Sequence, residues 1–342
     1  MPLKQYIAQV INGRSLSLDA AETAMNIIMR GEATPAQIGS YLTALRMKGE
    51  TVEEVAGSAK SMRNHVVSVP LDVADFDNML VDTCGTGGDG KHTFNISTTA
   101  AFVVAGAGVK VAKHGNRAAS SKSGSADVLL ALGANLDLTA QQVADCVHHT
   151  GIGFLYAINH HPAMRFAIGP RREIGQRTIF NVLGPLTNPA GATHQLLGVY
   201  DAALTERMAH VLGALGSQGA YVVHGADGLD ELSTTGVNQV SYPLAGNVTT
   251  RQLDPADLGL ATASLDDMVG GTPDENAAIT LGILSGDDKG PRRDIVLLNA
   301  AAALGIADND LAGGLVRARE AIDSGSALYT LNNWIERTQI FR

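Results

Sequence analysis

The hydrophobic positions at the start of the chain recur at the spacing of an amphipathic helix. The i, i+3, i+4, i+7 rule is followed by Leu3, Tyr6, Ile7, Val10 and Ile11. These positions place the apolar side chains on one side of a helix. The pattern therefore predicts a first helix that packs against a neighbouring element.

Start signals predict three further helices before residue 67. Ser17 can cap a helix that Gly31 closes. Thr34-Pro35-Ala36-Gln37 and Thr51-Val52-Glu53-Glu54 each read as a capping box, and the first has proline at the first helical position. Four short helices with apolar stripes favour a small helical domain, which we place at residues 1–70.

From residue 78 onward, extended and helical segments alternate. The predicted strands are 79–81, 109–113, 154–157, 195–200 and 221–224, and the predicted helices are 97–107, 127–132 and 205–215. Past residue 240 the signals weaken until two helices at 276–284 and 295–304. Such alternation predicts an α/β domain with a mainly parallel central sheet, which we place at residues 75–342. Ligands of such sheets bind beyond the carboxyl ends of the strands.

Charge and cysteine content narrow the class of protein. The formal net charge is −9, which disfavours nucleic acid or an anionic membrane as a partner. Cys84 and Cys146 are too few for a disulfide framework or a cysteine-rich zinc site, and they suit a reducing compartment. The apolar run 100–109 is about half the length of a membrane span, and the first residues lack a signal-peptide core. We therefore expect a cytoplasmic protein.

Glycine is abundant, with 38 residues among 342, and much of it lies where strands hand over to helices. The first such segment, residues 82–99, has the sequence Asp-Thr-Cys-Gly-Thr-Gly-Gly-Asp-Gly-Lys-His-Thr-Phe-Asn-Ile-Ser-Thr-Thr. Glycines expose backbone N–H groups to a ligand, and the helix that follows directs its free N–H groups to the same space, which favours a phosphate. The alternative is a tight strand-to-helix connection. Cys84 within it is better read as a small buried side chain than as a nucleophile.

A second segment, residues 113–125, carries positive charge in a chain whose net charge is negative. Lys113, Arg117 and Lys122 are its cations, and it contains no carboxylate. Gly115 and Gly124 allow close approach of a ligand to the backbone. A solvated basic loop is the alternative. Two separate anion sites suggest a substrate that is phosphorylated at two positions.

Two further segments carry charged side chains. Asp230 and Glu231 follow a predicted strand and can hold Mg²⁺, which takes one or two carboxylates together with water and substrate phosphates; an exposed acidic turn is the alternative. Arg171 and Arg172 follow Pro170, where we expect a helix to start, and arginine can bind a carboxylate through two parallel hydrogen bonds. A charged helix face is the alternative there. His160 and His161 do not have metal-ligand spacing.

Taken together, these segments resemble the anthranilate phosphoribosyltransferases of tryptophan biosynthesis. The matching motifs, in chain order, are Gly-Thr-Gly-Gly-Asp-Gly at 85–90, Asn-Ile-Ser-Thr at 95–98, Lys-His-Gly-Asn-Arg at 113–117, Ser-Ser-Lys-Ser-Gly at 120–124, Arg171-Arg172, Arg-Thr-Ile-Phe-Asn-Val-Leu-Gly-Pro-Leu-Thr-Asn-Pro at 177–189, and Asp230-Glu231. The resemblance implies a helical domain hinged to a larger α/β domain and joined by residues near 165–185. It also implies a homodimer formed through the helical domains.

The resemblance implies a role for each matching residue. The residues expected around 5-phosphoribosyl 1-diphosphate are Gly85, Gly88, Asp89, Thr93, Asn95, Ile96, Ser97, Thr98, Lys113, His114, Gly115, Asn116, Arg117, Ala118, Ala119, Ser120, Ser121 and Ser125. Anthranilate is expected at Gly85, Asn116 and Arg171, and Mg²⁺ at Ser97, Asp230 and Glu231. His114 is the candidate acceptor of the amine proton.

Two other functions share parts of this pattern. Pyrimidine-nucleoside phosphorylases share the implied fold and the phosphate loop, but residues 113–117 favour the transferase. A non-enzymatic relative that binds nucleic acid is disfavoured by the net charge of −9. An anthranilate synthase subunit, as a separate chain, is a candidate partner.

Overall fold

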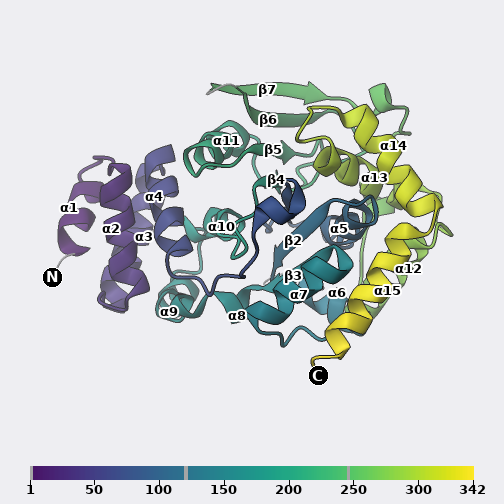
Figure 1. Ribbon diagram of the computed structural model, residues 1–342. Coiled ribbons are helices and arrows are strands. Elements are labelled where there is room, and N and C mark those ends of the chain that lie inside the picture. The colour runs from purple at the N-terminus through teal and green to yellow at the C-terminus, as the bar shows by residue number, and fades with distance from the viewer. Residues whose placement is uncertain (1–2, 119–121, 245–246) are drawn as a thin grey trace.

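The computed structural model describes residues 3–118, 122–244 and 247–342. Its N-terminal helices form a bundle at one end of the molecule, next to an α/β domain (Figure 1). The bundle helices are α1 (Leu3–Ile11), α2 (Leu18–Met29), α3 (Pro35–Lys48) and α4 (Val52–Arg63). Ser17, Thr34 and Thr51 cap α2, α3 and α4, and the two threonines make both hydrogen bonds of a capping box. The predicted helical starts are confirmed.

The α/β domain is built on a seven-stranded sheet with the order β3-β2-β1-β4-β5-β6-β7. The strands are β1 (Leu80–Gly85), β2 (Lys110–Gly115), β3 (Ile152–Tyr156), β4 (His194–Gly198), β5 (Gly219–His224), β6 (Asn238–Leu244) and β7 (Asn247–Leu253). All pairings among the first five strands of this order are parallel, and β6 and β7 pair antiparallel. The expected mainly parallel sheet is confirmed. Gly85 pairs with Gly198, so β1 and β4 end together.

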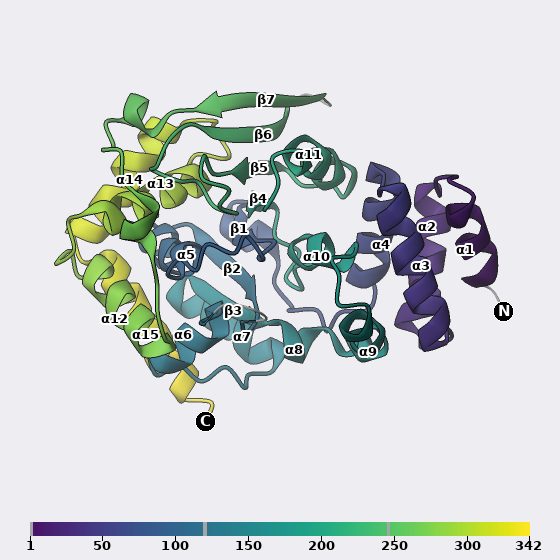
Figure 2. The same cartoon turned by 180° about the vertical axis from the view of Figure 1, so that it is seen from behind.

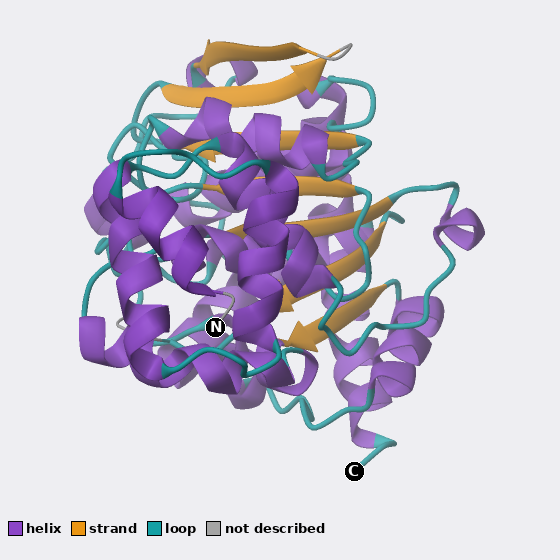
Figure 3. Ribbon diagram, turned by 90° about the vertical axis from the view of Figure 1, so that its left-hand side faces the viewer, coloured by secondary structure: helices purple, strands orange, loops and turns teal. Residues whose placement is uncertain are grey.

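Helices cover both faces of the sheet, and Figure 3 shows them in front of and behind the strands. The longer helices of this domain are α5 (Ile96–Gly106), α6 (Ser125–Ala131), α7 (Ala140–Thr150), α11 (Leu204–Ala214), α12 (Pro273–Leu284), α13 (Pro291–Leu304), α14 (Leu311–Asp323) and α15 (Ser326–Gln339). Leu196 and Leu197 of β4 point to opposite faces, and each belongs to a different hydrophobic cluster. The Leu197 cluster also contains the bundle core, so the bundle and one face of the sheet share a continuous apolar interior.

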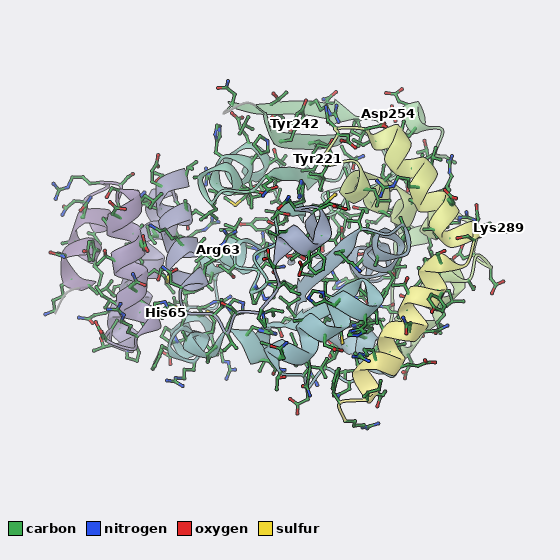
Figure 4. All side chains as sticks on the ribbon, viewed as in Figure 1. Arg63, His65, Tyr221, Tyr242, Asp254 and Lys289 are labelled. Carbon is green, nitrogen blue, oxygen red and sulfur yellow. The ribbon has the colours of Figure 1, made fainter. Side chains whose placement is uncertain are left out.

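The bundle packs against the rest of the chain through α4, which contacts α11 and α10 (Phe180–Leu183), and through α9 (Arg165–Ile174). Arg63, at the end of α4, extends toward the α/β domain (Figure 4). Its Nε donates to the Leu186 carbonyl at 2.8 Å and its Nη1 to the Leu215 carbonyl at 3.2 Å. Helix α9 packs against α3 and α2, and it lies beside the bundle in Figure 2. Residues far apart in sequence therefore meet next to the bundle.

Several elements differ from the sequence prediction. The predicted helix start at Pro170 is wrong, because α9 begins at Arg165 and holds Pro170 in its interior. The hairpin of β6 and β7 was not predicted, since β7 lies at the sheet edge and most of its side chains are at least partly exposed. The short helices α8 (Ala157–His160) and α10 (Phe180–Leu183) also lack a long periodic pattern. No helix of the described segments has the length and apolar content needed to cross a bilayer.

Candidate functional site

A cavity of about 410 Å³ lies at the edge of the sheet where β1, β2 and β4 end. It is lined by residues 84–90, 92–98, 113–118 and 123–125 together with Asn181, Asp230 and Glu231. Three of the four predicted segments therefore meet in one cavity. Ala119, Ser120 and Ser121 lie outside the described residues.

The glycine-rich loop requires glycine for two separate reasons. Gly87, Gly88 and Gly90 have φ angles of 71°, 78° and 74°, which side chains with a Cβ rarely adopt. Gly85 is limited by space, because a Cβ there would lie 2.2 Å from Oδ2 of Asp230. The loop thus curves back on itself and brings its backbone against the acidic pair.

Asp230 and Glu231 are held by backbone groups of the first segment. Gly87 N–H donates to Oδ2 of Asp230 at 2.6 Å, and Ser97 N–H donates to Oε1 of Glu231 at 3.1 Å. A Cβ on Gly198 would lie 1.6 Å from the Asp230 carbonyl oxygen, so β4 packs directly against this acidic turn. Gly198 was not among the predicted site residues.

The acidic turn has a second support that the sequence reading missed. Asn299, buried in α13, accepts a hydrogen bond from Leu232 N–H at 3.0 Å and donates to the Leu232 carbonyl at 2.8 Å. An asparagine inside the apolar run 295–304 was the available signal, because a buried amide needs partners. The turn after Glu231 is thereby fixed to the helical layer.

The electrostatics of the acidic pair fit a bound cation. Burial raises the pKa of Asp230 well above its ordinary value, and the charges of Glu231 and Asp89 raise it further. Burial also raises the pKa of Glu231 to about 7, which Lys113 opposes. With the Ser97 hydroxyl nearby, the donors are oxygen atoms of the kind that Mg²⁺ prefers. The described residues contain no group of three or more His, Cys, Asp or Glu side chains arranged as a complete metal site, so most ligands would come from water and substrate.

Lys113 is a buried cation beneath the cavity, with 3% of its surface exposed. Its Nζ donates to the Thr83 carbonyl and to Ser97 Oγ, the latter at 3.3 Å. Burial lowers the pKa of Lys113, and Asp82 is the first of the carboxylates that oppose this shift. Asp82 is held in turn by the N–H of His114 at 3.1 Å and by Nδ2 of Asn188 at 2.9 Å. The charges of Glu231 and Asp230 oppose the same shift, so Lys113 interacts electrostatically with the acidic pair.

His114 points its ring at His161. Their Nε2 atoms are 3.0 Å apart and their ring centroids 4.9 Å apart. Burial lowers the pKa of His114 to about 3 and that of His161 to about 4, so both rings are neutral at pH 7. One Nε2 must therefore donate its proton to the other.

The rest of the second segment is organised by a residue that the sequence reading did not select. Oδ2 of Asp127 accepts hydrogen bonds from the N–H groups of Ala118 at 3.0 Å and Gly124 at 2.9 Å. Arg117 donates through Nε to the Tyr156 hydroxyl at 2.9 Å, and Ser125 Oγ donates to the Asn116 carbonyl at 3.1 Å. The loop is therefore closed at its base by a carboxylate just beyond the predicted segment.

The first segment is supported from the side by residues 268–270. Phe94 N–H donates to the Met268 carbonyl at 3.0 Å, and Gly270 N–H donates to the His92 carbonyl at 2.9 Å. Asn95 uses its side chain within the protein, accepting from Nδ2 of Asn276 at 3.0 Å. Thr93 lies between these contacts, so the end of the loop has a fixed path into α5.

Arg171 is not one of the described residues that line the cavity. It lies in the last turn of α9, where its guanidinium carbon is 5.0 Å from the centroid of the Phe180 ring. Burial lowers its pKa, and Asn181, the residue after Phe180, does line the cavity. The predicted contact of Arg171 with anthranilate remains a prediction.

Comparisons with known proteins agree with this geometry. Residues 4–66 match the helical bundle domain of a glycosyl transferase family, and residues 77–328 match its a/b domain. Anthranilate phosphoribosyltransferase of Moorella thermoacetica is 56% identical over 340 residues, covering 98% of each chain. That of Roseiflexus sp. is 55% identical over 339 residues, again covering 98% of each.

Solved structures extend the comparison to three dimensions. The Thermus thermophilus anthranilate phosphoribosyltransferase has a TM-score of 0.92 at 41% identity, covering 97% of this chain and 99% of that one. The Saccharomyces cerevisiae enzyme, in complex with PRPP (5-phosphoribosyl 1-diphosphate) and Mg, has a TM-score of 0.90 at 31% identity, covering 98% of each. The chain belongs to the anthranilate phosphoribosyltransferase family of tryptophan biosynthesis.

Proposed function

We propose that this cavity is where the chain joins the amine of anthranilate to C1 of 5-phosphoribosyl 1-diphosphate, releasing diphosphate. The observation that carries the proposal is the convergence of a glycine loop, the buried Lys113 and the acidic pair Asp230 and Glu231 in one cavity of about 410 Å³. A substrate with two phosphorylated positions needs both an anion cradle and a means to neutralise its charge. The product is N-(5-phosphoribosyl)anthranilate.

In this proposal the two loops divide the phosphorylated substrate between them. The diphosphate lies on Gly85, Gly88, Asp89, Thr93, Asn95, Ile96, Ser97 and Thr98, where the loop meets the N-terminus of α5. The ribose and its phosphate lie against Lys113, His114, Gly115, Asn116, Arg117, Ala118 and Ser125. Backbone N–H groups and a helix N-terminus favour negative charge at the first position, and the cations of the second segment favour it at the other.

Ser97, Asp230 and Glu231 would hold Mg²⁺. When bound, Mg²⁺ supplies positive charge that offsets the charge on the diphosphate leaving group. The raised pKa values of the two carboxyls support this assignment, because an ionised buried pair needs a compensating cation. The yeast relative in complex with PRPP and Mg gives independent support.

The protein contributes position and electrostatics to the reaction. As the bond from C1 to the diphosphate oxygen breaks, loop N–H groups other than those of Gly87 and Ser97, which the acidic pair holds, stabilise the charge on the leaving oxygen, and the amine nitrogen bonds to C1. An aryl amine is neutral at pH 7, so no base is needed before attack. A pKa of about 3 makes His114 a weak proton acceptor, and the proton then passes to solvent after the C–N bond forms. Gly85, Asn116 and Arg171 orient anthranilate, with Arg171 on its carboxylate.

We also propose a helical domain of residues 1–70 joined by about 165–185, and a homodimer formed through it. The packing of α9 on α3 supports the first point. Ile11 and Met47, with 65% and 84% of their surface exposed on α1 and α3, support the second.

The free thiols of Cys84 and Cys146 fit a reducing compartment, and we place the enzyme in the cytoplasm. An anthranilate synthase subunit would bind as a separate chain.

The experiment follows anthranilate fluorescence in purified protein with 5-phosphoribosyl 1-diphosphate and Mg²⁺. We expect a decay that disappears when either substrate is left out or when EDTA is added. Phosphorolysis of thymidine or uridine by the same protein is measured in parallel. No decay together with phosphorolysis would replace this proposal with a nucleoside phosphorylase.

A further inference from the structure

One arginine links the glycine loop to two other parts of the protein. Arg177 lies between α9 and α10, and its Nη2 donates to the carbonyl of Gly88, 89 positions earlier in the chain. The same guanidinium stacks on Tyr200, with its carbon 3.9 Å from the centroid of the ring. None of the roles proposed above uses this side chain.

Tyr200 is itself attached to the loop. Its N–H donates to Oγ1 of Thr86 at 3.2 Å, and Thr86 N–H donates to the Gly198 carbonyl at 2.9 Å. Arg177 and Tyr200 therefore hold the loop at Thr86 and Gly88. Between those two points, Gly87 N–H makes its 2.6 Å hydrogen bond to Asp230.

The position of Arg177 is set by the helices on either side of it. Helix α9 packs on the bundle and ends at Ile174, and its C-cap residue Gly175 adopts a left-handed conformation with φ of 61°. Thr178 N–H then donates to Oδ1 of Asn181 at 2.9 Å, which fixes the start of α10. Arg177 projects from the short stretch between these two anchors. Its reach to Gly88 thus depends on where the bundle-packed segment lies.

We propose that Arg177 is a positioning residue that holds the glycine loop in its phosphate-binding conformation and couples that conformation to the bundle-packed segment. The inference rests on the proposed function, in which this loop binds the diphosphate. Three glycines with positive φ give the loop many alternative conformations when it is free, and ordering them on binding costs entropy. A charged donor on the Gly88 carbonyl orders the loop beforehand, so less affinity is lost when the substrate binds.

Arginine is the residue that this geometry needs. A planar guanidinium can donate at its edge while its face lies on an aromatic ring, whereas a lysine ammonium is a compact point charge. Arg177→Lys should therefore recover only part of the effect. Tyr200→Phe keeps the ring and should behave as the unchanged protein.

The test compares Arg177→Ala and Arg177→Lys with Arg165→Ala. Arg165 is an exposed arginine of α9 whose guanidinium carbon is 4.7 Å from the ring centroid of Phe166. Arg165→Ala therefore removes one positive charge and one contact with an aromatic ring, as Arg177→Ala does. For Arg177→Ala we expect the KM for 5-phosphoribosyl 1-diphosphate to rise about tenfold or more, with kcat changed less than about threefold. At saturating phosphoribosyl substrate the KM for anthranilate should change less than about twofold. Isothermal titration of 5-phosphoribosyl 1-diphosphate with Mg²⁺ should show the same loss of affinity without turnover.

Each outcome decides the inference. Equal effects on both KM values, or a fall in kcat and Tm with no selective effect, would mean that Arg177 only maintains the fold and would overturn it. An Arg177→Ala protein that binds the phosphoribosyl substrate as the parent does would also overturn it. If Arg177→Ala does not fold, Arg177→Lys must show the selective rise in KM. An inactive parent protein would instead contradict the proposed function, so the two failures are distinguishable.

Discussion

Replacing Glu231 by glutamine should make the protein more stable and much less active. Glu231 is 9% exposed, and burial raises the pKa of its carboxyl group from 4.5 to about 7. The substitution keeps the shape of the side chain, and an amide oxygen can still accept the hydrogen bond that Ser97 N–H donates at 3.1 Å. The change therefore removes a buried negative charge with little change in packing.

The direction and size of the change in stability follow from proton linkage. Between pH 4.5 and about 7 the unfolded chain has released the Glu231 proton while the folded protein still holds it, so this group lowers stability as the pH rises through that window. Above pH 7 the full effect is about 3 kcal/mol. The glutamine variant also loses the attraction to Lys113, so we expect a net gain of about 1–3 kcal/mol, or about 1–4 °C in Tm for a chain of this length.

The assay is thermal unfolding of the parent and Glu231→Gln in EDTA at pH 8 and pH 5, with Glu320→Gln as an exposed control of equal charge change. Buried histidines are present in both proteins, so the difference between the two at each pH reports the acidic pair, because Glu231→Gln also removes a charge that raises the pKa of Asp230. The gain should appear at pH 8 and shrink to under about 1 kcal/mol at pH 5. A variant that is as stable as the parent or less stable at pH 8 would refute the reasoning about this carboxyl.

The remaining predictions concern other parts of the site. Arg171→Ala should raise the KM for anthranilate about tenfold or more, because a charge-assisted contact contributes about 1.5–3 kcal/mol. Steady-state kinetics with varied anthranilate measure this KM, and an unchanged value would remove Arg171 from the site. Gly198→Ala places a methyl group 1.6 Å from the Asp230 carbonyl oxygen. We therefore expect the free energy of unfolding to fall by about 1–3 kcal/mol and kcat/KM to fall about 100-fold. Gly282→Ala, whose Cβ would have no atom within 4 Å, should leave kcat/KM unchanged. Burial lowers the pKa of His161 to about 4, so between pH 6.5 and 4 the unfolded chain is protonated there while the folded protein is not. The stability of the folded protein should therefore fall as the pH drops from 6.5 to 4. A His161→Gln protein whose urea midpoint declines as steeply as the parent's in that range would contradict this.

The sequence predicted the parts of the fold that strong local signals govern. Thr34 and Thr51 cap helices where expected, since a capping box is a local arrangement of a few adjacent groups. The strands that end in glycine-rich loops were also found, 79–81 as a short apolar run and 109–113 from the alternation of apolar and polar residues. The hairpin of β6 and β7 was missed because β7 is an edge strand whose side chains are all at least partly exposed, so its sequence lacks an apolar run.

Within the candidate site, the sequence identified residues whose chemistry is unusual for their surroundings. The cations of 113–117 and the acidic pair at 230–231 stand out in this way, and both line the cavity. Supports such as Asn299, Asp127 and Gly198 were missed, because their importance arises only from contacts across the chain. Pro170 misled the prediction since proline usually marks the start of a helix, whereas α9 includes it in its interior.

The central claim is that the acidic pair and the glycine loop form one cation-dependent site for the phosphoribosyl substrate. The most direct measurement is isothermal titration of 5-phosphoribosyl 1-diphosphate into the parent protein, Glu231→Gln and Glu320→Gln, each with Mg²⁺ and with EDTA. The account predicts that parent and Glu320→Gln bind only with Mg²⁺, and that Glu231→Gln binds about tenfold more weakly or worse. Binding that is equally tight in EDTA, or unchanged in Glu231→Gln, would contradict it.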